Sequence, residues 1–170
     1  MFDRNQKRGR GRKQREPKDD FEQKVIDLAR VTRVMAGGKR MRFRACVVVG
    51  DMKGQIGMGV AKGADVAISV NKAAAKARKK LITIPLVNDT IPHVIVSKFC
   101  GAEVFLKPAR TGRGVIAGGP VRSVVELAGI KNITSKMRGS KNKVNNVHAV
   151  MNGLQELRTE KEIRKIRASK

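Results

Sequence analysis

The chain has 170 residues, and its 38 Lys and Arg against 14 Asp and Glu give a formal net charge of +24. A compact protein with this charge repels itself unless a polyanion neutralises it, so nucleic acid is the favoured partner and a membrane is not. No apolar run approaches the ~20 residues that cross a bilayer, and no signal-peptide apolar region opens the chain. Trp and Tyr are absent and Phe occurs 5 times, which argues against binding of single strands by aromatic stacking.

The two cysteines, Cys46 and Cys100, have no metal-like spacing. They indicate a reduced, cytoplasmic protein with unpaired thiols.

The first 20 residues form a basic segment with almost nothing to bury, predicted to be disordered alone and able to order against RNA. From Phe21 the apolar spacing predicts a helix, with Asp19 or Asp20 as its N-cap. Its apolar stripe comprises Phe21, Val25, Leu28, Ala29 and Thr32.

The stretch "GGKRMRFRACVVVGD", residues 37–51, alternates like a strand. One face carries Arg40, Arg42 and Arg44 followed by Cys46, and the other face is apolar. We leave two hypotheses open for the arginine face. Either it binds RNA phosphates along its length, or its inner part packs on the second half of the chain and leaves only the outer arginines free.

A turn at 50–54 leads to a return strand, "QIGMGVAKG", whose glycines predict a bulge or the close approach of another backbone. Asp65 is the predicted cap of the next helix, which ends near Leu81.

A second β region predicts strands over "HVIVSKF" and "AEVFLKP", with a turn at Cys100 and Gly101. Pro120 fits the first turn of a helix that ends at Gly129. A short strand and a basic loop follow, then a helix capped by Asn142 and a charged, frayed end. The sequence thus predicts two compact α+β units between two basic tails.

The sequence contains few patterns that are typical of an enzyme active site. His93 and His148 lack the neighbouring nucleophile or carboxylate of a charge-relay system, and the acids are too scattered for a metal cage. "GRGVIAGGPVR" could hold a phosphate at a helix start, but it lacks the ending of a P-loop, and "GQIGMG" has the wrong glycine spacing for a dinucleotide site. We expect no catalysis, no cofactor and no metal.

Several basic clusters lack compensating acids, and we predict that they bind RNA mainly through its backbone and shape. The candidate RNA-binding residues are Arg33, Lys39, Arg40, Arg42, Arg44, Lys53, Lys62, Lys72, Lys76, Arg113, Lys136, Arg138 and Lys141.

Two long segments carry a family resemblance. "GGKRMRFRACVVVGDMKGQIGMGVAKGADVAISVNKAAAKARKKL" and "GVIAGGPVRSVVELAGIKNITSKMRGSKNKVNNVHAVMNGL" closely resemble the bacterial small-subunit ribosomal protein five family. The resemblance implies a domain like the double-stranded-RNA-binding fold over 21–88. It also implies a second, two-layer α/β domain over 89–157 with a left-handed βαβ crossover. Basic tails at 1–20 and 158–170 are not matched.

The resemblance further implies a structural constituent of the small ribosomal subunit that binds 16S rRNA near the neck and central pseudoknot. Such a protein contacts ribosomal proteins four and eight, lies near the messenger entry path, and supports subunit assembly and translational accuracy. We expect it in the cytoplasm and not as a homo-oligomer.

By the same resemblance, Thr32, Arg33 and Gly38 fall in a neck loop beside RNA on which spectinomycin acts. Gly114 and Arg122 fall on the face towards ribosomal protein four, where accuracy is set. Two positions depart from the family pattern. Lys143 stands where many members have proline, and Met35-Ala36 replaces a more basic pair.

Two other classes remain as alternatives. A free-standing RNA chaperone or double-stranded-RNA-binding regulator would share the composition. An enzyme is conceivable because small-molecule kinases use a related C-terminal fold, by analogy only.

Overall fold

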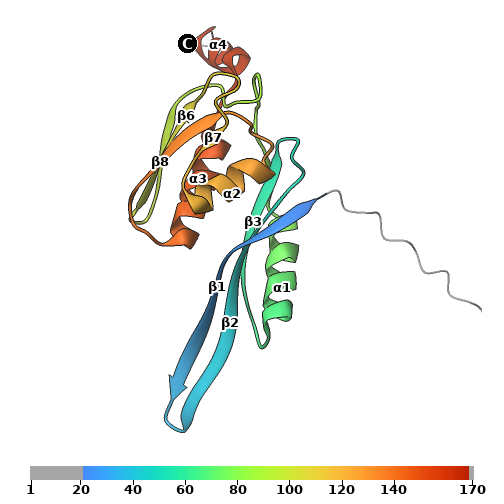
Figure 1. Ribbon diagram of the computed structural model, residues 1–170, viewed down its shortest axis with the longest axis vertical. Coiled ribbons are helices and arrows are strands. Elements are labelled where there is room, and N and C mark those ends of the chain that lie inside the picture. Colours follow the sequence, from blue (N-terminus) through green and yellow to red (C-terminus); the bar gives the residue numbers. More distant parts are fainter. Residues whose placement is uncertain (1–20, 169–170) are drawn as a thin grey trace, which may run out of the picture.

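The computed structural model describes residues 21–168, so the predicted basic tail over 1–20 lies outside the described residues. The fold is α+β and is built from four layers (Figure 1). Helix α1 covers one face of a first sheet. Helices α2 and α3 pack between that sheet and a second sheet.

The first sheet is antiparallel, with strand order β1-β2-β3-β4. Its strands are β1 (Glu22–Met35), β2 (Gly38–Gly50), β3 (Gln55–Gly63) and β4 (Leu81–Thr83), and α1 spans Val66–Arg78. The glycines predicted to admit a close backbone do so. A Cβ at Gly59 would lie 2.1 Å from the carbonyl oxygen of Ala73, so the alternate glycines of β3 let α1 approach the sheet.

The helix predicted from Phe21 is wrong, because this segment is the long strand β1, paired with β2 from Glu22 to Met35. Most of β1 is exposed or half-buried on both faces. A strand of this kind shows no clear period of two, so the accidental helical spacing of its apolar residues dominated the pattern. Its β-branched residues Val25, Ile26, Val31 and Val34 fit a strand better than a helix.

Strand β2 divides the interior in two. Ala45, Val47 and Val49 pack against α1. Cys46 and Val48 point the other way, into a core shared with the second half of the chain. This confirms the hypothesis that the inner part of the arginine face, at Cys46 and Val48, packs on the second half of the chain.

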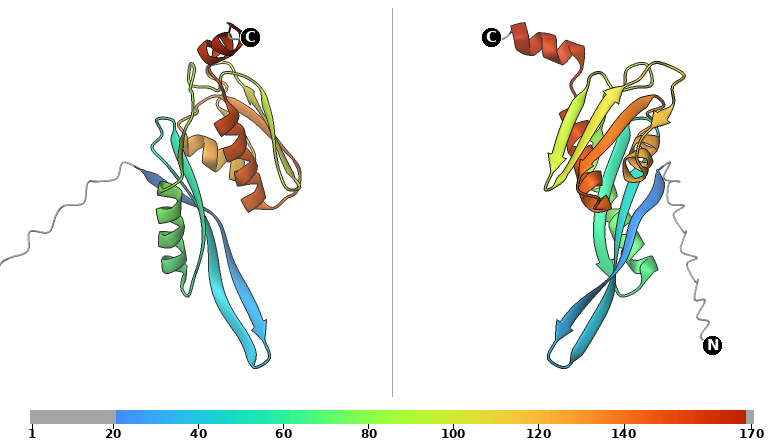
Figure 2. Two further views of the ribbon diagram at one scale, coloured as in Figure 1. Left: turned by 180° about the vertical axis from the view of Figure 1, so that it is seen from behind. Right: turned by 60° about the vertical axis from the view of Figure 1, so that its left-hand side comes forward.

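The second sheet has strand order β5-β6-β8-β7. Its strands are β5 (Ile95–Phe99), β6 (Ala102–Pro108), β7 (Val115–Ile116) and β8 (Ile133–Gly139), with α2 (Gly119–Leu127) and α3 (Lys143–Glu156). Strands β7 and β8 are parallel and joined through α2. Figure 2 shows that both helices lie on one face of this sheet and leave the other face uncovered.

The predicted helix ends are confirmed at four positions. Asp65 accepts a hydrogen bond from the Val66 amide, and Asn142 accepts one from the Val144 amide. Pro120 lies in the first turn of α2, and Gly129 follows that helix with φ +80°. Because Asn142 caps α3, the helix begins at Lys143 without the proline that the resemblance led us to expect there.

The described part of the C-terminal tail is helical rather than frayed, since α4 spans Glu160–Ala168. Thr159 and Glu162 form a reciprocal capping box, in which each backbone amide donates to the other side chain. The charged composition alone did not reveal this helix.

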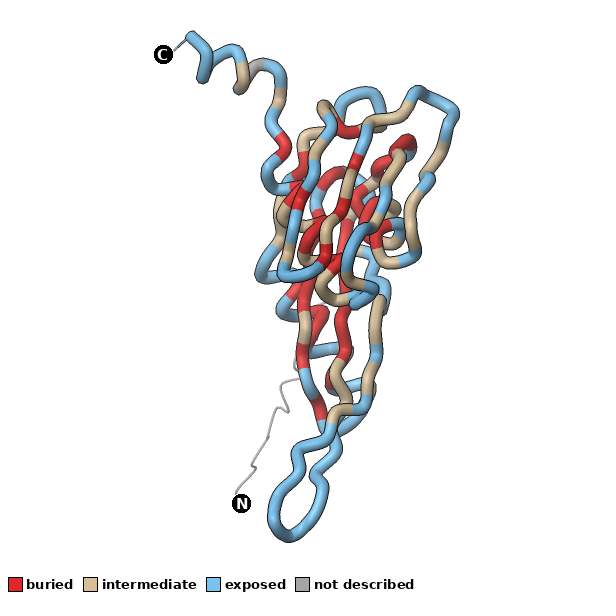
Figure 3. Tube along the Cα trace, turned by 90° about the vertical axis from the view of Figure 1, so that its left-hand side faces the viewer, coloured by how far each residue is buried: buried red, intermediate tan, exposed pale blue. Residues whose placement is uncertain are grey.

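Ion pairs also connect the two halves. Asp27 of β1 lies 3.3 Å from the Arg44 guanidinium and 3.8 Å from the Lys143 ammonium of α3. Lys24 lies 3.2 Å from the Glu126 carboxylate of α2. Figure 3 shows the buried residues gathered in the body, whereas the β1–β2 hairpin extends from it with an exposed end.

Gly59→Ala should lower the free energy of unfolding by about 3 kcal/mol, in the upper range for overpacking, because the added methyl group meets backbone of α1. Urea denaturation measures this. Gly119→Ala is the matched control, since its methyl group would meet no atom within 4 Å and should change stability little. Equal stability of the two variants would contradict the close packing of α1 on β3.

Burial raises the pKa of the Cys46 thiol to about 11, with a further contribution from Asp27, whereas Cys100 is exposed. We therefore expect Cys100 to react with a thiol-specific disulfide reagent at neutral pH and Cys46 to react only after denaturation. Spectrophotometric thiol counting in native and denatured protein checks this. Rapid reaction of both thiols in the native chain would show that the shared core opens readily.

Candidate nucleic-acid interface

The outer part of the β1–β2 hairpin has no core of its own. Met35 through Arg42 are all exposed, and Val34 and Met41 are 69% and 51% exposed. A two-stranded ribbon is marginally stable in water unless something packs against it. This end of the molecule therefore gains little stability from its own packing.

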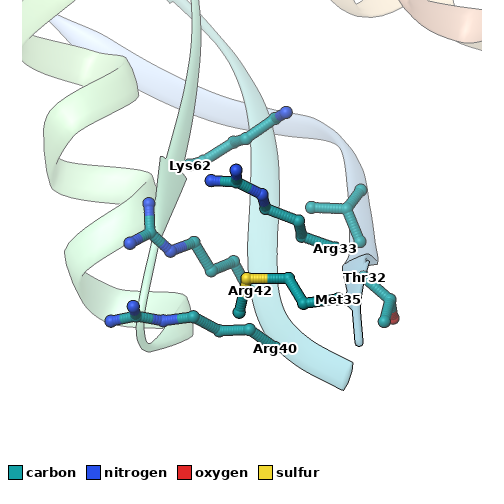
Figure 4. Close-up of a pocket in the computed structure, with 7 residues that line it drawn as sticks. Thr32, Arg33, Met35, Arg40, Arg42 and Lys62 are labelled. Carbon is teal, nitrogen blue, oxygen red and sulfur yellow. The ribbon is translucent and has the colours of Figure 1, made fainter. Parts of the chain in front are cut away.

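The strand register gathers cations on one face of the hairpin. Arg33 lies opposite Arg40, and Val31 lies opposite Arg42. Lys62 joins this face from β3, where it is the neighbour of Arg44. Together they form a hollow of about 230 Å³. Figure 4 shows its cationic side chains; the lining residues are Val31, Thr32, Arg33, Met35, Arg40, Arg42 and Lys62.

The hollow is electrostatically unbalanced. Its lining contains three guanidinium groups and one ammonium group, and no carboxylate. Like charges directly opposite each other on neighbouring strands destabilise the strand pair. Arg33 and Arg40 are opposite each other in this way. An anion placed between them would relieve this repulsion, and guanidinium groups suit the oxygens of a phosphate.

Arg44 lies on the same face but in a different environment. Its Nη2 donates to Asp27 Oδ2 at 3.3 Å, and its side chain is only 34% exposed. Arg44 is therefore held in the sheet by an acidic partner, whereas Arg40 and Arg42 project beyond it. Lys39 and Gly38 occupy the end of the hairpin, where Gly38 has φ +144°.

Lys72 and Lys76, both on α1, lie in different places. Lys72 borders a second depression that shares Arg40, Arg42 and Lys62 with the first. Lys76 lies in a cleft between α1 and α3, where its Nζ donates to the Val60 carbonyl oxygen. Burial, helped by the charge of Lys80, lowers the pKa of His148 in that cleft.

The remaining sequence candidates do not join the hairpin cluster. Lys53 lies in the β2–β3 turn, at the opposite end of β2, beside the end of α2. Arg113 lies in the loop before β7. Lys136 and Arg138 lie on β8 rather than in the basic loop expected there, and Lys141 follows that strand.

The loop that holds Arg113 and Gly114 is fastened by a side chain that the sequence did not single out. The Oδ1 atom of the buried Asn132 accepts hydrogen bonds from the amides of Gly112 and Gly114, both at 3.1 Å. Gly112 and Gly114 have φ +88° and +75°, which L residues rarely adopt. The partners are 18 and 20 residues away from Asn132, so no local motif marks it.

Arg122 lies on α2 with its Nε donating to Glu126 Oε1 at 2.7 Å. The Lys24 ammonium contacts the other carboxylate oxygen. The hydrogen bond from Arg122, followed by the contact with Lys24, lowers the pKa of Glu126. Arg122 nevertheless remains more than half exposed, so it can also meet a partner.

Within residues 21–168, no group of three His, Cys, Asp or Glu side chains is arranged to hold a metal ion. None of the helices in that range has the length and apolarity needed to span a membrane. The described cationic groups, rather than a reactive cluster, dominate the surface of the hairpin.

Comparison with known protein families gives two matches. The model described as ribosomal protein S5, N-terminal domain, matches residues 21–85. The model described as ribosomal protein S5, C-terminal domain, matches residues 97–167. The matches follow each other in the order of that family and leave only a short gap between them. The chain therefore belongs to the ribosomal protein S5 family, the RNA-binding structural constituents of the small ribosomal subunit.

Proposed function

We propose that this chain binds 16S rRNA near the neck and central pseudoknot of the small subunit, with the hairpin hollow as its main phosphate site. The observation that carries the proposal is the hollow lined by Arg33, Arg40, Arg42 and Lys62 without a carboxylate. Lys39 and Lys72 extend the same basic surface. In this proposal Arg44 stabilises the sheet through Asp27 rather than binding RNA.

The chemistry of the hollow supports backbone recognition of folded RNA. Its cations are presented by paired strands, so their spacing is fixed before binding. Structured RNA is recognised mostly by its shape and by contacts to phosphates and 2′-hydroxyls, for which guanidinium groups are suited. On the resemblance alone, Thr32 and Gly38, which lie at the same end of the hairpin, would belong to the neck loop beside the RNA on which spectinomycin acts.

We propose a second role for the loop held by Asn132. Gly114 and Arg122 would face ribosomal protein four, and through that contact the chain would influence translational accuracy. The clamp from Asn132 supports this role because it fixes the loop before any partner arrives. Contact with ribosomal protein eight, a position near the messenger entry path and residence in the cytoplasm belong to the same proposal.

We also propose 21–88 as an RNA-binding domain like the double-stranded-RNA-binding fold, and 89–157 as the second, C-terminal domain of the family. Further basic contacts to RNA would come from Lys53, Lys76, Arg113 and Lys141. Sucrose-gradient sedimentation followed by a high-salt wash tests the assignment as a whole. Salt-resistant presence in the small subunit alone is expected. A chain found mainly at the top of the gradient would instead favour a free-standing RNA chaperone.

Changing Arg33, Arg40 and Arg42 together to Gln should weaken binding to a neck fragment of 16S rRNA. The slope of log K against log salt is negative, and each lost phosphate contact reduces its magnitude by about 0.7 to 0.9. The magnitude of the slope should therefore decrease by about 2. Filter binding or fluorescence anisotropy across a salt series measures it.

The matched control replaces Arg158, Lys165 and Arg167 by Gln, which removes the same charge from exposed positions near and on α4. This control should keep the wild-type slope. If both triple variants lose the same slope, net charge rather than the hairpin hollow carries the binding.

Asn132→Ala should release the loop at Gly112 and Gly114, because both amides lose their acceptor. We expect hydrogen exchange at these amides to become at least about tenfold faster. Ribosomes carrying the variant should misread a reporter codon at an altered rate. Thr111→Ala, an exposed change in the same loop, is the control for both measurements. Unchanged exchange in Asn132→Ala would contradict the clamp.

A further inference from the structure

The uncovered face of the second sheet carries one aromatic ring among cations. Helices α2 and α3 cover the opposite face (Figure 2). On the uncovered face, Val96 lies opposite Phe105 on β6, and Phe105 lies opposite Lys136 on β8. Val96 is 51% exposed, and Phe105 is half-buried although no helix covers it. This row therefore forms a small apolar platform at the middle of the sheet.

Charged side chains border the platform on both sides. The next row across the three strands consists of Lys98, Glu103 and Arg138. Glu103 pairs with both cations, at 3.1 Å and 3.6 Å. The contact with Lys98, followed by the attraction of both cations, lowers the pKa of Glu103 and keeps it ionised.

Beyond the platform on the other side, Lys107 and Thr134 form the next row. Neither Lys107 nor Lys136 takes part in an ion pair within the described range. The face thus carries four cations and one carboxylate around a single ring.

The ring and one of these cations are already in contact. The guanidinium carbon of Arg138 lies 6.0 Å from the centroid of Phe105, at the outer limit of a cation–π contact. The guanidinium therefore lies over the ring without close contact, and Glu103 is its ion-pair partner. A flat group that stacks on Phe105 would also meet this guanidinium, which can itself stack on a base.

We propose that this face binds single-stranded RNA, with one base stacked on Phe105 and the adjoining phosphates held by Lys136, Lys107 and Arg138. An unpaired base offers a flat face to an aromatic ring, and its backbone offers anions to the surrounding cations. Double-stranded RNA offers phosphates but no free base face. A protein partner would need a wider apolar surface than Val96 and Phe105 provide. The site is separate from the hairpin hollow and does not depend on the role proposed for it.

The amino-acid composition argued against aromatic stacking because Trp and Tyr are absent. That argument applies to binding sites that stack several bases and does not exclude a site for one base. A single ring suffices for one base when it lies on an uncovered sheet with cations in the neighbouring rows. Phe105 is placed in this way, whereas Phe99 stacks on His148 with 4.4 Å between ring centroids.

The test uses the full chain and an oligouridylate of about ten nucleotides, with an RNA duplex of the same length as comparator. Phe105→Leu keeps an apolar side chain but removes the ring, and it should bind the single strand about tenfold more weakly. Phe105→Tyr, which keeps a stacking surface, should bind like the wild type. Binding to the duplex should change little in either variant.

A second measurement needs no variant. Oligouridylate carrying photoreactive 5-iodouracil should cross-link to the peptide that contains Phe105, identified by mass spectrometry. Equal single-strand binding by Phe105→Leu and wild type would overturn the proposal. Cross-links confined to the hairpin would also overturn it, and the face would then belong to a protein neighbour.

Discussion

The alternation of side chains between the two faces of β2 determines how the two halves of the molecule pack together. From Ala45 inward, both faces of this strand are buried, one against α1 and one against the second half of the chain. Further out, the same two faces leave the body and become surface. Arg40 and Arg42 occupy the face that, a few residues later, carries Cys46 and Val48 into the shared core. The buried inner half of the strand therefore sets the direction of the exposed outer half, and one alternation of side chains produces both the core face and the arginine face.

This geometry concentrates like charges where packing cannot offset their repulsion. Arg33 and Arg40 face each other on an exposed ribbon, and the Asp27 carboxylate of the same sheet pairs with Arg44 and Lys143 instead. The hairpin gains little from burial, so its stability in isolation is low. A polyanion would convert the repulsion into attraction without moving the strands. In the proposed role, the repulsion within the charge cluster of the free chain would become a source of binding energy when RNA is bound.

The sequence allowed prediction of the parts that rest on local chemistry. Asp65, Asn142, Pro120 and Gly129 act as predicted because caps and helix ends depend on a few neighbouring residues. Strand β1 was mistaken for a helix because it is paired but poorly buried, so its pattern carries no period of two. That error has a consequence for the site. If β1 were a helix, Asp27 would not lie beside β2 as the ion-pair partner of Arg44. The sequence therefore offered no reason to assign Arg44 a different role from Arg40 and Arg42. Asn132 was missed for a related reason, since its partners lie in a loop far along the chain.

The two basic surfaces of the molecule differ in chemistry, and the difference has a physical consequence. The hairpin hollow offers cations without an aromatic ring, so the RNA affinity proposed for it would depend on released counterions and would fall steeply with salt. The face around Phe105 offers fewer unpaired cations and one stacking surface, so a larger share of the affinity proposed for it would persist when salt is raised. In its proposed role the hairpin would anchor the chain on folded RNA, where many phosphates are fixed in place. In its proposed role the sheet would bind a single strand more weakly and release it more readily, because only one base stacks and few phosphates are held.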